Sequence, residues 1–150
     1  MTKSERDVAD WAAEGRQYVR EVLAEFGQDP DLMQQDPAAV LHLMNEALSE
    51  EIPADLSQDD RNSMLTLLVA FLAEFLITVH GARWAWLDEP ASSGGGRWVV
   101  AGIPHPLGQD TEPVDVGGIA DAALSGTEPV RFTALVNEAE LRSGMRVIKD

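Results

Sequence analysis

Residues 64–86 read MLTLLVAFLAEFLITVHGARWAW and set the centre of the molecule. Between Met64 and Val79, two threonines and Glu74 are the polar interruptions, so apolar side chains cover most of the circumference of a helix. A membrane span needs about 20 mostly apolar residues, whereas this run is shorter and carries a carboxylate near its middle. The pattern therefore predicts a buried central helix.

Local signals mark both ends of this helix. Ser57 followed by Asp60 is the Ser-x-x-acid pattern of a helix start. Gly81 can adopt the left-handed backbone conformation that ends a helix. Beyond Gly81 the apolar period changes toward two, with Trp84 and Trp86 on one face, which predicts a strand.

The spacing of apolar residues predicts the other elements, and together they indicate one α+β domain over residues 1–150. We expect a helical part over about 4–80, with a buried central helix packed on a small antiparallel sheet. A hairpin and C-terminal part with short helices covers about 82–148. The predicted helices are Ser4–Phe26, Pro37–Glu50, Ile119–Leu124 and Thr133–Arg142, with Gln28–Gln35 as a polar connection; the predicted strands are Arg83–Leu87, Arg97–Ala101 and a short Val114–Val116, and Met145–Ile148 is a terminal strand or a frayed end.

The net charge is −15, from 26 acidic and 11 basic residues. The imbalance concentrates in residues 1–62, which hold 15 acidic and 5 basic residues. Such a charge opposes binding to nucleic acid and to anionic membranes. It either keeps the protein in solution or attracts a basic protein partner. Solvation is the favoured interpretation, and attraction of a basic protein by the acidic residues 1–62 is the alternative.

The chain has no cysteine, which excludes disulfides, thiol nucleophiles and zinc sites built on thiolates. Residues 1–10 contain no apolar run of the kind that a secretory signal needs. We therefore expect a cytoplasmic protein.

Glu74 is a carboxylate on a nearly all-apolar helix. It must find a partner, reach water, or have its ionised form disfavoured. Arg83 is the nearest cation beyond the turn at Gly81. We predict a structural ion pair between Glu74 and Arg83, with a functional acid as the alternative.

Three tryptophans concentrate on the predicted hairpin: Trp84, Trp86 and Trp98. Because one face of the hairpin must pack on the central helix, we expect two of the three indoles to belong to the core. The alternative is an exposed aromatic patch around Trp84 and Trp86 that contacts a protein partner.

The histidines and loops predict no cofactor and no metal site. His42 and Glu46 lie four apart on a predicted helix, but a metal site needs further ligands. His80 is expected to interact with the carbonyl end of the central helix, and His105 to be a loop residue between two prolines. The glycines at 94–96 lack the lysine and hydroxyl residue of a phosphate loop.

A resemblance is carried by VAFLAEF at residues 69–75, followed by HGARW at residues 80–84. This pattern resembles small bacterial domains of unknown function, some encoded near toxin or secretion systems. Their shared element is a helix with two small residues three apart and then Glu, which leads into a Gly-Ala-Arg-Trp strand. Ala70 and Ala73 stand where those families often show Gly. The resemblance covers roughly residues 64–102 and implies an α+β fold, with no catalytic residue carried over.

These observations favour a non-enzymatic protein-interaction module, an immunity-like or secretion-associated factor that binds another protein, with a basic protein as the candidate partner. The first alternative is an enzyme whose site brings together Glu74, His80, Arg83 and His105. The second is a structural subunit of a homo-oligomer, such as a homodimer.

Overall fold

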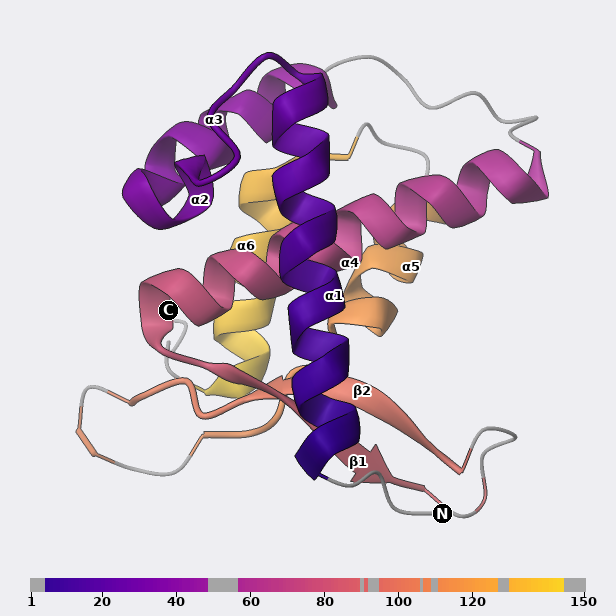
Figure 1. Ribbon diagram of the computed structural model, residues 1–150. Coiled ribbons are helices and arrows are strands. Elements are labelled where there is room, and N and C mark those ends of the chain that lie inside the picture. Colours follow the sequence, from indigo (N-terminus) through magenta and orange to yellow (C-terminus); the bar gives the residue numbers. More distant parts are fainter. Residues whose placement is uncertain are drawn as a thin grey trace, which may run out of the picture.

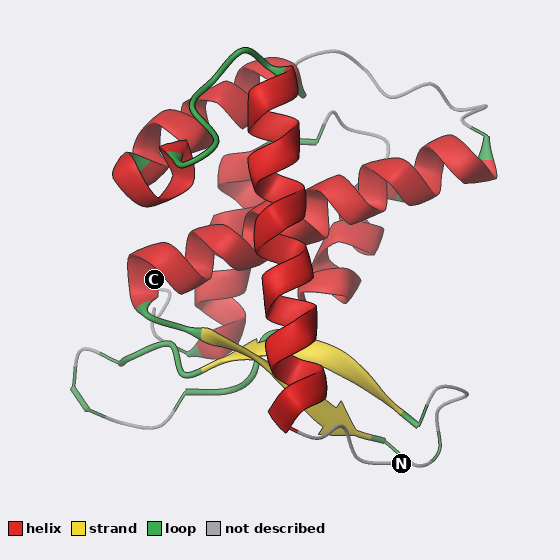
Figure 2. Ribbon diagram, in the orientation of Figure 1, coloured by secondary structure: helices red, strands yellow, loops and turns green. Residues whose placement is uncertain are grey.

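The computed structural model describes residues 5–48, 57–89, 91, 95–105, 107–108, 111–126 and 130–144. Within these ranges the chain forms six helices and one two-stranded antiparallel sheet (Figure 2). The predicted α+β class is confirmed, with a helical N-terminal half and short C-terminal helices. The elements are α1 (Glu5–Glu25), α2 (Leu32–Gln35), α3 (Pro37–Ala47), α4 (Gln58–His80), β1 (Arg83–Asp88), β2 (Gly96–Ala101), α5 (Val116–Leu124) and α6 (Phe132–Ser143).

Helix α4 is the centre of the fold. Helix α1 crosses it on one side, and α5 and α6 pack against it on the other (Figure 1). Seven consecutive residues, Ala70–Leu76, are buried, so the middle of α4 is enclosed around its whole circumference. The apolar run extends beyond this enclosed part, because Leu65 is half-buried and Val79 is 44% exposed.

Among the helices in the described ranges, α4 alone is long and apolar enough to cross a membrane. This criterion uses only length and composition, and the core helix of a soluble protein also meets it.

The ends of α4 follow the predicted signals. The Ser57 hydroxyl accepts a hydrogen bond from the Asp60 backbone N–H at 3.1 Å. Gly81 has a φ of 68°, and its N–H donates to the Ile77 carbonyl.

The sheet is the predicted hairpin. Strand β1 pairs with β2 in an antiparallel register that places Trp86 opposite Trp98. Strand β2 begins at Gly96, and the position requires glycine because a side chain there would collide with the Leu87 carbonyl oxygen. In the view of Figure 1 both strands pass behind the first turns of α1, and α1 contacts β1.

Two predicted boundaries need correction, and two others are not tested. The polar connection Gln28–Gln35 contains α2, whose Met33 is fully buried. The predicted third strand is a single bridge between Val114 and Val100, because the Asp115 side chain caps α5 and draws Val116 into that helix. Residues 49–50 and 145–148, where a helix end and a terminal strand were predicted, lie outside the described ranges.

Candidate functional site

All four tryptophans of the chain form one connected cluster. Trp11 from α1 stacks on Trp98 from β2, with ring centroids 4.8 Å apart and planes 2° from parallel. Trp84 meets both rings edge-to-face, at 5.6 Å from Trp11 and 6.4 Å from Trp98. Trp86 completes the cluster at 5.2 Å from Trp98. The cluster therefore joins α1 to the hairpin.

Burial differs among the hairpin tryptophans. Trp84 is 4% exposed and belongs to the core, whereas Trp86 and Trp98 are half-buried. Trp86 donates a hydrogen bond from its indole N–H to the Asp88 carboxylate at 3.0 Å. Sequence reasoning missed the fourth member, Trp11, because its position on a separate helix gives no local sign that it stacks on the hairpin.

Two indole N–H groups of this cluster are buried without an acceptor among the described residues, those of Trp11 and Trp84. A buried donor without an acceptor costs about 1–3 kcal/mol. Unsatisfied buried donors are uncommon in native proteins and occur at functional or strained sites.

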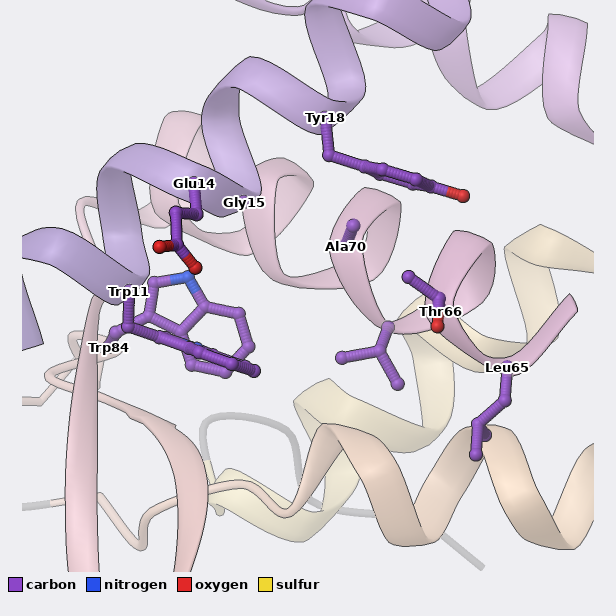
Figure 3. A pocket seen from close by; sticks show the side chains of 9 residues that line it. Trp11, Glu14, Gly15, Tyr18, Leu65, Thr66, Ala70 and Trp84 are labelled. Carbon is purple, nitrogen blue, oxygen red and sulfur yellow. The ribbon is translucent and has the colours of Figure 1, made fainter. Parts of the chain in front are cut away.

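A pocket of about 370 Å³ opens beside the cluster, between α1 and α4 (Figure 3). In Figure 3 the indoles of Trp11 and Trp84 stand at one end, and the Tyr18 ring stands toward the other. The described residues that line the pocket are mostly apolar, and Glu14 is the charged one among them. The lining residues are Trp11, Glu14, Gly15, Tyr18, Leu65, Thr66, Val69, Ala70 and Trp84.

Helical spacing explains this lining. Trp11, Glu14 and Tyr18 are three and four residues apart, so they lie along one face of α1. Leu65 and Val69 are four apart on the facing side of α4, in the half-buried part of its apolar run. Gly15 has no side chain to fill the space between the helices. The pocket therefore stands on regular elements, which hold its walls in place.

An acidic stripe runs along α1 beside the pocket. Its members are five exposed carboxylates: Asp7, Asp10, Glu14, Glu21 and Glu25. Because an α-helix turns by about 100° per residue, these five positions fall within a sector of about 60° around the helix axis. Glu14 belongs to both the stripe and the pocket lining. The spacing of three, four, seven and four residues is readable from the sequence, and sequence reasoning missed it because it counted charges without placing them on the helix.

Glu74 lies in the enclosed part of α4 and is 4% exposed. Burial raises the pKa of its carboxyl, and the charge of Arg16 on α1 partly opposes this rise. The predicted ion pair with Arg83 is absent from the described part of the chain. Arg83 instead begins β1 with an exposed side chain whose guanidinium lies over Gly102. The physical reason is that Glu74 lies six residues before the end of α4, where the cation that acts on it is Arg16 of α1, whereas Arg83 lies beyond the helix end in β1.

The histidines occupy separate places. His42 and Glu46 form an exposed pair at 3.3 Å, and no group of three metal-ligating side chains occurs among the described residues. His80 contacts Glu140 on α6, with Nε2 and Oε2 3.1 Å apart and both side chains largely buried. The His105 ring accepts a hydrogen bond at Nδ1 from the Leu107 backbone N–H.

The four residues of the alternative enzyme site are not joined to one another. Among the described residues, no hydrogen bond or ion pair links any two of Glu74, His80, Arg83 and His105. His80 faces α6, whereas His105 belongs to the loop after β2. The pocket beside the tryptophan cluster contains none of the four.

Comparison of the chain with protein-family models, with curated proteins and with solved structures found no match.

Proposed function

We propose that this chain is a non-enzymatic protein-interaction module that binds a basic partner through α1. The observation that carries the proposal is the acidic stripe of α1, placed along the edge of an open apolar pocket. A partner segment with cationic and apolar side chains would match this surface, because its charges meet the carboxylates and an apolar group meets the pocket rim. The proposal fits an immunity-like or secretion-associated factor that acts in the cytoplasm.

The distribution of positive charge supports this proposal. Four of the eight arginines in the described ranges form ion pairs within the chain: Arg20 with Asp31, Arg61 with Asp121, Arg97 with Glu89 and Asp115, and Arg142 with Glu138. Residues 5–48 carry ten acidic and three basic side chains. Internal pairing therefore does not neutralise the front of the molecule, and a negative potential remains for a partner.

Single exposed charge pairs contribute only about 0–1 kcal/mol each, so affinity must come from several carboxylates acting together. Their attraction weakens with salt, because the Debye length falls from about 10 Å at 0.1 M to about 3 Å at 1 M. Binding through the stripe is therefore expected to weaken steeply as salt is added.

The test compares two triple variants with equal net charge. The stripe variant carries Asp10→Asn, Glu21→Gln and Glu25→Gln. The control variant neutralises three exposed carboxylates elsewhere, with Asp59→Asn, Asp60→Asn and Glu112→Gln. Wild type and both variants are immobilised and exposed to a native lysate at low and high salt, and retained proteins are identified by mass spectrometry.

We expect one basic protein to be retained by wild type and by the control variant at low salt, and to be lost at high salt. The stripe variant should fail to retain it. Equal retention by the two variants would show that α1 is not the binding face. Retention that is insensitive to salt would show that charge does not drive the interaction.

A further inference from the structure

The pocket between α1 and α4 has the size and lining of a small-molecule site. Its volume of about 370 Å³ lies within the range of about 300–1,000 Å³ that is typical of ligand pockets. Its walls come from two helices and a strand, so they are formed before any ligand arrives. The identity of the occupant must follow from the chemistry of these walls.

Charge excludes one class of ligand. Glu14 is the charged group among the described lining residues, and no basic side chain lies among them. Burial and the nearby charge of Glu25 raise the pKa of the Tyr18 phenol, so this ring stays neutral at physiological pH. An anionic ligand would meet a carboxylate, with the net charge of −15 around it. A cationic ligand is attracted both by the Glu14 carboxylate and by the negative net charge of the protein.

The aromatic walls favour a particular kind of cation. Trp11 and Trp84 pack edge-to-face with their planes at 85°, and Trp11 also stacks on Trp98. We call the Trp11–Trp84 pair the aromatic corner; both rings line the pocket, and Tyr18 adds a third ring (Figure 3). The electron-rich faces of such rings attract cations, most strongly those whose positive charge is spread over alkyl groups and carries little bound water. Leu65 and Val69 offer apolar contact to the rest of such a ligand.

We propose that this pocket binds a small organic cation with a substituted ammonium group, held between the aromatic corner and the Glu14 carboxylate. The ammonium group lies against Trp11 and Trp84, and the apolar body of the ligand extends toward α4. This proposal and the protein-binding role of α1 share Glu14 and the pocket rim, but their tests are separable, because the stripe variant keeps Glu14 and every other lining residue.

The experiment is isothermal titration calorimetry at constant ionic strength with three probes. They are choline, its uncharged isostere with a tert-butyl group in place of trimethylammonium, and benzyltrimethylammonium, which adds an apolar ring. We expect choline to bind at least about tenfold more tightly than the isostere. Benzyltrimethylammonium should bind more tightly than choline because it buries more apolar surface.

Matched variants locate the binding. Glu14→Gln should weaken benzyltrimethylammonium binding about tenfold, whereas Glu21→Gln, with the same charge change on the same stripe but outside the pocket lining, should leave it within about twofold. Tyr18→Leu should weaken binding of the cation while leaving that of the uncharged isostere unchanged. A thermal melt of each variant confirms that it folds.

Three results would overturn the proposal. Equal affinity for choline and its isostere would identify an apolar site without preference for charge. Equal losses in Glu14→Gln and Glu21→Gln would reduce the effect to general attraction by an acidic protein. Absence of heat and of saturation with benzyltrimethylammonium, in a wild-type protein whose melt shows it to be folded, would mean that the pocket takes no such cation.

Discussion

Replacing Phe71 by Ala tests the enclosure of α4 directly. Phe71 has no exposed surface and lies within the seven-residue segment that other elements surround. Truncation of a phenylalanine at such a site costs about 3–5 kcal/mol, from the lost transfer free energy and the cavity that remains. In a domain of this length each kcal/mol lowers Tm by about 2–4 °C, so the melting temperature should fall by about 6–20 °C.

The matched control lies on the same helix. Val79 is an apolar residue of α4 that is 44% exposed, so Val79→Ala should change stability by less than about 0.5 kcal/mol. Both variants are measured by circular dichroism during thermal and urea unfolding. If Phe71→Ala melts within a degree or two of Val79→Ala, the helix is not enclosed as described.

Three further predictions concern buried charge and backbone space. Because burial raises the pKa of Glu74, the folded state holds the carboxyl proton more tightly than the unfolded chain does, and stability is lost as pH rises above about 4.5. The stability of Glu74→Gln relative to wild type, measured by urea unfolding, should therefore increase from about pH 4 to about pH 7. A stability difference that stays constant over this pH range would contradict the prediction. Glu140→Ala should destabilise by about 1–3 kcal/mol, because it leaves the largely buried His80 ring without its hydrogen-bond partner, and an unchanged urea midpoint would dismiss the pair. Gly96→Ala should destabilise the hairpin, because the added methyl group collides with the Leu87 carbonyl oxygen. Near-ultraviolet circular dichroism, which reports the packing of the tryptophan cluster, should then lose its signal. An unaltered spectrum would contradict the described strand register.

The features that the sequence predicted well are those with local causes. The start of α4 at Ser57 and its end at Gly81 depend on hydrogen bonds within a few residues, and the alternation at Trp84 and Trp86 belongs to one strand. The short helix α2 was missed because its four residues lie in a polar segment, too short for a helical period to show.

The features that the sequence did not predict depend on distant contacts. His80 was expected to interact with the carbonyl end of its own helix, but it contacts Glu140, sixty residues later. The cation that acts on Glu74 is Arg16 on a crossing helix, whereas Arg83 is merely closer along the chain. The pocket arises from the same crossing of α1 over α4, which no single segment encodes.

That crossing underlies both the acidic surface and the pocket, so the most direct test is native-state amide hydrogen exchange of α1 and α4. We expect the amides of Leu68–Leu76 to exchange only through global unfolding, and those of Val19–Leu23 on α1 to be protected as well, because Val19 and Leu23 are buried. Rapid exchange throughout α4, or an α1 that exchanges like an undocked helix, would contradict the account.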